Sequence, residues 1–121
     1  MKRLVIPEAA ILKQCLQWLA WNGVFCWRNN TTAHANTYTR KDGSRGKSFI
    51  RTGKPGSADI IGMLPKASKR PGAFLAVECK SARGTASELQ NRFRDDVMKS
   101  GGVYILARSI DDLERELKPL L

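Results

Sequence analysis

Three charged residues, Asp59, Glu78 and Lys80, interrupt apolar stretches in the middle of the chain. If residues 59–64 and 73–80 form the two strands of a hairpin, the symmetric register places Asp59 directly opposite Glu78, with their Cβ atoms about 5 Å apart. Because side chains alternate between the two faces of a strand, Lys80 points to the same face as Glu78. The spacing therefore predicts two carboxylates and an ammonium group on one face of a sheet.

Opposed carboxylates repel each other, and an apolar strand has little structural use for them. A divalent cation between them removes the repulsion, because two carboxylates, a backbone carbonyl and waters make the incomplete oxygen shell that Mg²⁺ favours at phosphate sites. The cation could activate water and polarise a phosphoryl oxygen, while Lys80 orients the attacking water or neutralises the charge that develops on the phosphate. A simple ion pair between Lys80 and one acid is the alternative, but it leaves the other acid unexplained.

The positive charge of the chain is concentrated in its middle segment. The 121 residues carry 21 Lys and Arg against 11 Asp and Glu, a formal net charge of +10, and residues 28–83 hold twelve of these basic residues but three of the acids. A segment this basic suits a polyanion, of which nucleic acid is the commonest in a cytoplasm, whereas a merely soluble basic surface is the alternative. The candidate DNA-binding residues are Arg28, Arg40, Lys41, Arg45, Lys47, Arg51, Lys54 and Ser57.

The elements that must position these residues follow from hydrophobic periodicity and from end signals. Apolar residues at three- and four-residue spacing predict an amphipathic helix over residues 7–21, with Pro7 in its first turn and Asn22-Gly23 at its end. The run from Thr85 to Glu88 matches a capping box and opens a second helix, and Ser109 caps a last one. The predicted strands cover residues 24–28, 59–64, 73–80 and 103–107.

Residues 29–48 are polar, and Asp42-Gly43 could turn a flexible hairpin whose returning strand is residues 49–51. A polar segment this long in a small domain is typically functional or disordered, and we expect it to be poorly ordered without DNA. Since the strand over residues 73–80 is apolar on both faces, it should lie centrally in its sheet. The expected fold is α/β (α+β), a mixed sheet flanked by helices in the order α-β-β-β-α-β-α, with the hairpin after the first strand.

The composition indicates one globular domain over residues 1–121, because hydrophobic residues make up 42% and charged residues 26%. No apolar run approaches the ~20 residues of a membrane span, and Pro7 and Glu8 interrupt the basic N-terminus before an export signal develops. The three cysteines, Cys15, Cys26 and Cys79, lack the spacing of a paired or metal-binding motif. We interpret them as buried thiols and expect a cytoplasmic protein.

The order of these motifs resembles a known nuclease core. Residues 56–62, which read Gly-Ser-Ala-Asp-Ile-Ile-Gly, are followed by Val77-Glu78-Cys79-Lys80, and this set resembles the PD-(D/E)XK nuclease superfamily. More narrowly, residues 53–59 resemble the virus-type replication-repair nuclease (VRR-NUC) domains in their stand-alone, phage-like form. The resemblance covers almost the whole chain and implies a restriction-endonuclease-like core. One departure is Ala58, where the superfamily name has proline, although backbone position rather than this residue sets the metal site.

The resemblance implies a role for each matching residue. Asp59 and Glu78 would hold Mg²⁺ or Mn²⁺ together with the main-chain carbonyl of Cys79, and Glu8 would approach the metal from the first helix. Lys80 would assist catalysis, and Gln90 would contact the site or the DNA from the helix after the motif. Glu8 could instead only complement its helix N-terminus, and Gln90 could be an ordinary polar helix residue.

The implied function is that of a Mg²⁺/Mn²⁺-dependent endodeoxyribonuclease that cuts branched DNA, such as four-way junctions, in phage or bacterial replication and repair. A target-recognition extension does not fit within 121 residues, which favours structure-specific cutting. The alternatives are a catalytically silent nucleic-acid-binding module and a nuclease of the same core with a flap, restriction or transposition role.

Assembly and base stacking add two further expectations. Resolving a four-way junction takes two opposed cuts, so we expect a homodimer, with Trp18 and Trp21 of the first helix available for contact. Trp27, beside Arg28, is a weaker candidate for stacking on a base.

Overall fold

A four-stranded sheet forms the centre of the protein in the computed structural model, which describes residues 5–30, 33–51 and 53–121. Its strands lie in the order β1-β4-β5-β6. Neighbouring strands are antiparallel except for β5 and β6, which are parallel, so the sheet is mixed as predicted. The strands are β1 (Phe25–Arg28), β4 (Ile60–Met63), β5 (Phe74–Cys79) and β6 (Val103–Ala107).

Strand β5 lies inside the sheet, between β4 and β6. All of its residues except Phe74 are buried, which its nearly continuous apolar sequence predicts for a central strand. Its last two residues, Glu78 and Cys79, are therefore held rigidly where the strand ends.

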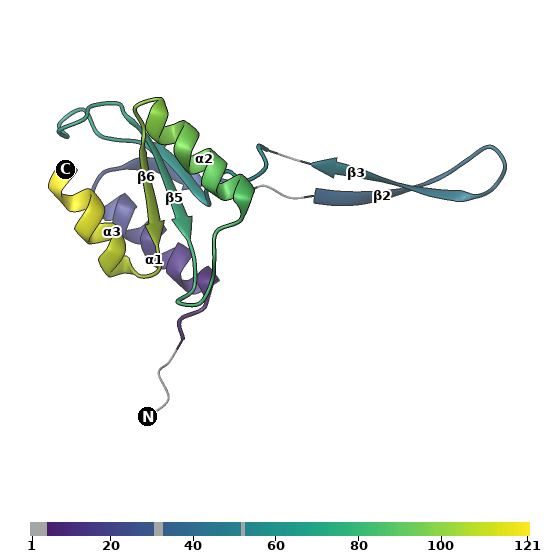
Figure 1. Cartoon of the computed structure of the whole chain (residues 1–121), viewed down its shortest axis with the longest axis horizontal. Coiled ribbons are helices and arrows are strands. Elements are labelled where there is room, and N and C mark those ends of the chain that lie inside the picture. Colours follow the sequence, from purple (N-terminus) through teal and green to yellow (C-terminus); the bar gives the residue numbers. More distant parts are fainter. Residues whose placement is uncertain (1–4, 31–32, 52) are drawn as a thin grey trace.

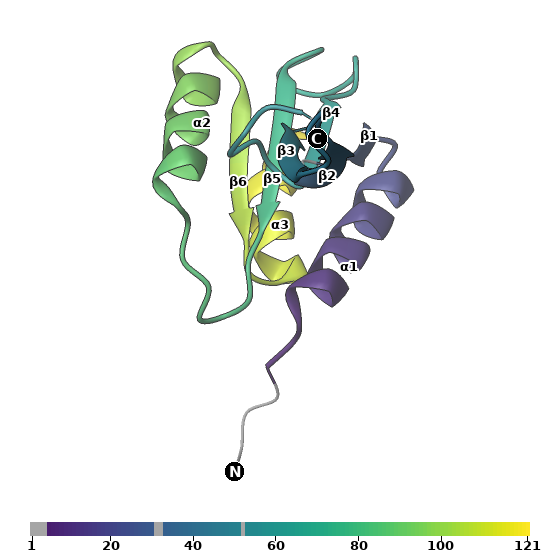
Figure 2. The ribbon, with the colours of Figure 1, turned by 90° about the vertical axis from the view of Figure 1, so that its right-hand side faces the viewer.

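Helices α1 (Glu8–Trp21) and α3 (Ile110–Leu117) cover one face of the sheet, and a short 3₁₀ turn (Lys118–Leu120) follows α3 (Figure 2). The main core lies between these helices and that face. Pro7 does not belong to the first turn of α1, as the sequence suggested, but precedes it. Its backbone is extended, and its carbonyl accepts the first hydrogen bonds of the helix, from the N–H groups of Ala10 and Ile11.

Helix α2 (Glu88–Lys99) lies on the opposite face of the sheet. Its Phe93 and Val97 pack on Ala58 and Ala76 in a second, smaller core. The capping box predicted from Thr85 to Glu88 is wrong by two residues, because Ser87 is the residue that caps the helix. The Ser87 hydroxyl accepts from the N–H of Gln90, and the N–H of Ser87 donates to the side chain of Gln90.

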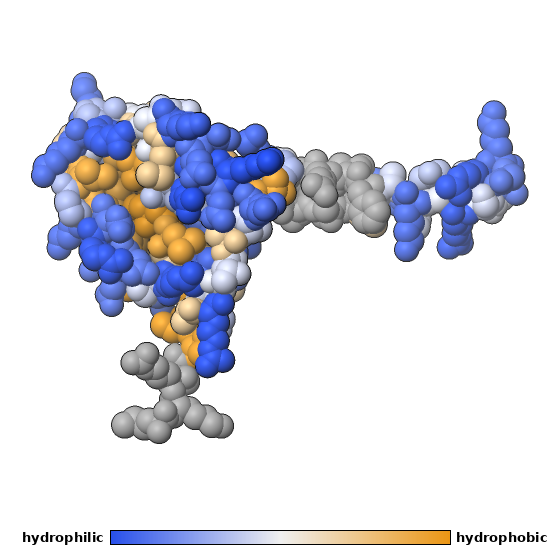
Figure 3. Space-filling model, in the orientation of Figure 1, coloured by the Kyte–Doolittle hydropathy of each residue, from blue (hydrophilic) through white to orange (hydrophobic). Residues whose placement is uncertain are grey.

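The polar segment after β1 forms a hairpin that projects far from the body (Figure 1). Its strands, β2 (Ala33–Thr39) and β3 (Arg45–Arg51), pair only with each other, in a second sheet. The returning strand predicted over residues 49–51 is therefore too short. At the turn, Oδ1 of Asp42 accepts from the N–H of Ser44 at 2.9 Å and from its hydroxyl at 2.6 Å. The far part of this hairpin is hydrophilic throughout (Figure 3).

None of the helices in the described parts of the chain is long and apolar enough to cross a membrane.

Candidate active site

The register of β4 and β5 brings Asp59 beside Glu78. Ile60 pairs with Val77 in this antiparallel ladder, so the next position of the same register holds Asp59 and Glu78, which confirms the predicted pairing. Glu8, the first residue of α1, joins them. One carboxylate oxygen from each of Glu8, Asp59 and Glu78 lies within 4.8 Å of the other two.

Backbone hydrogen bonds fix Asp59 in this position. Its Oδ2 accepts from the N–H of Cys79 at 2.8 Å, across the two strands. Its carbonyl accepts from the N–H of Asn29 at 2.7 Å. The side-chain amide of Asn29 also donates to Oγ of Ser57 at 2.8 Å and to the carbonyl of Ala58 at 3.0 Å. Asn29 therefore fastens the end of β1 to the start of β4, a role that no signal in the sequence indicated.

Glu78 is 2% exposed, and it is the buried member of the acidic cluster. Its Oε1 accepts from Nε2 of Gln90 at 3.1 Å. Its Oε2 is also buried, and no group in the described part of the chain forms a hydrogen bond with it. Burial, followed by the negative charge of Asp59, raises the pKa of Glu78 to about 8, although the nearby Lys80 ammonium acts in the opposite direction.

Lys80 points to the same side as Glu78, as strand alternation predicts. Its Nζ lies 3.8 Å from Oε1 of Glu8 and 3.8 Å from Oε1 of Glu78, so one cation bridges two of the acids. The backbone N–H of Lys80 donates to the carbonyl of Ala107 on β6. This bond holds the residue in line with the sheet one position beyond the end of β5.

Arg108 fastens the loop that follows Lys80. Its guanidinium donates at 2.7 Å to the carbonyls of Ser81 and Gly84, and its backbone N–H donates to Oδ2 of Asp112. These bonds set the path of the chain from β5 to α2. No pattern in the sequence singles out Arg108, because an arginine after a strand resembles any other basic surface residue.

The donor set fits a divalent cation. A buried carboxylate oxygen without a partner costs free energy, and two further carboxylates at this distance add repulsion. A cation bound among Glu8, Asp59 and Glu78 would relieve both costs, and hard oxygen ligands of this kind suit Mg²⁺ or Mn²⁺. The cluster can therefore hold a divalent metal ion.

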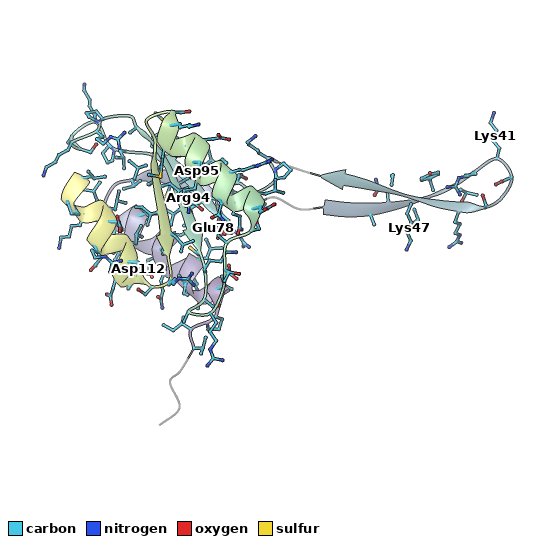
Figure 4. All side chains as sticks on the ribbon, viewed as in Figure 1. Lys41, Lys47, Glu78, Arg94, Asp95 and Asp112 are labelled. Atoms are coloured by element: carbon cyan, nitrogen blue, oxygen red, sulfur yellow. The ribbon has the colours of Figure 1, made fainter. Side chains whose placement is uncertain are left out.

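The predicted DNA-binding residues do not gather at this cluster. Lys41 and Lys47 lie on the hairpin, far from Glu78 (Figure 4). Arg28 is exposed at the end of β1, and Ser57 accepts the Asn29 hydrogen bond in the turn before Asp59. Arg40 and Arg45 also lie on the hairpin. Lys54 lies in a surface hollow beside Phe74. The side chain of Arg51 lies outside the described parts of the structure.

A comparison with protein families matches the chain to the VRR-NUC domain over residues 6–111. Comparisons with curated proteins and with solved structures gave no match. The matched range includes Glu8, Asp59, Glu78, Lys80 and Gln90, and the mixed sheet flanked by helices agrees with a restriction-endonuclease-like core. The chain therefore belongs to the VRR-NUC family and is a nuclease domain of the PD-(D/E)XK type.

Proposed function

We propose that this protein is a Mg²⁺- or Mn²⁺-dependent, structure-specific endonuclease that cuts branched DNA such as four-way junctions. The observation that carries the metal dependence is the buried Oε2 of Glu78, which has no partner among the described residues although two further carboxylates lie beside it. A carboxyl group in that setting remains protonated near neutral pH unless a cation compensates its charge. A buried carboxylate oxygen with no hydrogen-bond partner among the described residues is more readily explained by a metal than by packing.

Each residue of the cluster has a distinct task in this proposal. Glu8, Asp59 and Glu78 would hold the cation, and the carbonyl of Cys79 would complete the protein ligands. When bound, such a cation supplies Lewis-acid stabilisation of charge on the phosphate and lowers the pKa of a nearby water. Lys80 would orient the attacking water or balance the charge that develops on the phosphate oxygens. Gln90 would keep the Glu78 carboxylate in one orientation through its hydrogen bond.

The hairpin would hold the DNA outside the catalytic cluster. Arg45 and Lys47 alternate with Gly46 along β3, so they share one face of the hairpin, where their partners across the ladder are Thr39 and Thr37. Cationic and hydroxyl side chains are the usual donors to phosphate oxygens. A basic arm that projects from the body suits a substrate with more than one duplex arm.

The protein would act as a homodimer on a junction. One domain carries one cluster of carboxylates, whereas two opposed cuts need two clusters related by a two-fold axis. Trp21 is 78% exposed at the end of α1 and remains available for a subunit contact. Trp18 is less available, because its indole N–H donates to Oε1 of Glu114 at 2.9 Å.

A cleavage panel tests this function. Purified protein should cut a four-way junction faster than flap, duplex or single-stranded DNA in Mg²⁺ or Mn²⁺, and EDTA should stop the reaction. Asp59→Asn should abolish cutting, because it removes a charge while its side-chain oxygen can still accept the Cys79 N–H bond. The same variant should bind DNA normally in EDTA. Full activity of Asp59→Asn would refute the metal site, and a binder that cuts nothing would favour a silent binding module.

A further inference from the structure

In the described part of the chain, no helix covers the half of the sheet face on the α2 side that β1 and β4 form. Phe93 and Val97 of α2 cover the part formed by β5 and β6, and in Figure 2 this helix lies beside β6, away from β1. Four apolar residues on β1, β4 and the start of β5 are 40% to 69% exposed. We call them the apolar strip, and they are Phe25, Trp27, Met63 and Phe74.

The strand pairing places the apolar strip on the same face of the sheet as Asp59 and Glu78, farther along the strands. Trp27 pairs with Ile61, which follows Asp59 by two residues. The Trp27 position therefore lies about 7 Å along the strand direction and about 5 Å across it from Asp59, and one strand farther from Glu78. Phe25 pairs with Met63, and Met63 pairs with Phe74, one further step away. The strip therefore begins on β1, the strand next to the one that Asp59 precedes.

One lysine lies in each of two surface hollows at the margins of the apolar strip. A surface hollow of about 550 Å³ contains Phe25, Met63 and Lys66. A second hollow, of about 470 Å³, contains Phe74 and Lys54 together with Asp96. Apolar rings with ammonium groups beside them are the combination that holds nucleic acid, in which flat bases alternate with phosphates.

The two aromatic rings of β1 are held in place by each other. The ring centroids of Phe25 and Trp27 are 5.6 Å apart with an interplanar angle of 67°, an edge-to-face contact. Trp27 is half exposed, and its contact with Phe25 already restricts its rotamers. Stacking a base on this ring therefore costs little side-chain conformational entropy.

We propose that the apolar strip is a stacking surface for unpaired bases of the DNA substrate next to the scissile phosphate, with Trp27 as the first platform. This proposal rests on the nuclease function proposed above and adds a feature of the substrate to it: bases that lose their pairing at the branch point next to the cut. Duplex DNA gains nothing from the strip, because its bases are already stacked inside the helix.

The test is a binding measurement in EDTA, where neither metal nor cleavage contributes. Two DNA molecules of equal length and charge are compared, a fully paired duplex and one with splayed, unpaired thymines at a fork. Trp27→Leu, which keeps the apolar bulk but lacks the ring, should weaken binding to the forked DNA about 5- to 150-fold and leave duplex binding nearly unchanged. Trp27→Tyr should retain most of the preference for the fork. Phe25→Leu, a more exposed position that is safer for folding, should give a smaller loss of the same kind.

The outcomes are distinct. Equal losses on both DNA molecules, or no loss in Trp27→Leu, would overturn the stacking surface while leaving the metal-dependent cleavage tested by Asp59→Asn untouched. If Trp27→Leu instead halved the molecular mass in solution, the strip would be covered by a second copy of the chain and the proposal would be wrong.

Discussion

The side chain of Gln90 donates a hydrogen bond from Nε2 to Oε1 of Glu78, over 3.1 Å, from the first turn of α2 to the end of β5. At the same time, Oε1 of Gln90 accepts from the N–H of Ser87 at 2.9 Å, so the amide is used at both ends. One residue therefore completes the helix cap and orients the most buried carboxylate of the cluster. The functional interpretation and the ordinary helical interpretation of Gln90 apply together, and a substitution can separate them.

Gln90→Glu should do so, because its carboxylate can still accept the Ser87 N–H but cannot donate to Glu78. We expect metal-dependent cleavage to fall about 10- to 100-fold with the Ser87 bond kept, and the unfolding temperature in EDTA to fall because the new carboxylate repels Glu78. Gln90→Ala should lose the same activity and destabilise the protein by about 0.5–1.5 kcal/mol, because the N–H of Ser87 loses its side-chain acceptor while the Ser87 hydroxyl still accepts from the backbone N–H of residue 90. A wild-type cleavage rate in Gln90→Glu would restrict Gln90 to its capping role.

The burial of Glu78 predicts how the metal-free protein responds to pH. Its pKa is about 8 in the folded chain, above the ordinary value of 4.5, so the folded state keeps a proton that the unfolded state releases. This stabilisation is fully present below about pH 4.5 and is lost as the pH rises to about 8. In EDTA, the unfolding temperature of the wild type should therefore decrease over this range more steeply than that of Glu78→Gln. Parallel curves for the two proteins would contradict the raised pKa.

The hairpin should determine how steeply DNA binding depends on salt. Arg40 is best left intact, because its guanidinium donates to the carbonyl of Arg45 at 3.0 Å and lies over the ring of Tyr38. Replacing Lys41, Arg45 and Lys47 with Gln should reduce the slope of log K against log[salt] by up to about 0.9 for each phosphate that the hairpin no longer neutralises.

The matched control removes the same charge elsewhere, from exposed positions on α1, α2 and the C-terminal turn: Lys13, Lys99 and Lys118. This control should leave the slope close to that of the wild type. If both triple variants changed the slope equally, binding would follow net charge and the hairpin would be only a solvated surface.

Much of this architecture is predictable from local signals. The β4–β5 register follows from the symmetry of Asp59 and Glu78 about their loop, and the central place of β5 follows from its apolar sequence. Both features depend on neighbours in sequence or on strand period, which a single sequence displays directly.

Two contacts of the site depend on residues distant in sequence, which no local pattern encodes. Glu8 reaches the cluster because α1 packs across β5, and Asn29 reaches Asp59 because β1 pairs with β4. Thr85 and Ser87 are both suitable N-cap residues, so the local sequence does not decide between them. The hydrogen bond from Gln90 to Glu78 favours a helix that begins after Ser87. The sequence does not predict the full length of the hairpin strands, because their polar threonines and lysines show no hydrophobic alternation.

The last prediction concerns assembly and the pattern of cuts. If two copies act on one junction, light scattering at micromolar concentration should give about twice the chain mass of 13.5 kDa, and wild-type protein should make paired, symmetric nicks in opposed strands. Mixed dimers in which one copy carries Asp59→Asn provide the sharper test, because each copy would supply its own carboxylates. They should nick one strand and leave the opposed strand intact, at a rate per active site close to that of the wild type. A monomeric mass both free and on junction DNA, with wild-type cuts confined to one strand, would exclude paired resolution and favour a flap nuclease. In that event, the exposure of Trp21 would not indicate a subunit contact, and the hairpin would hold a single duplex arm.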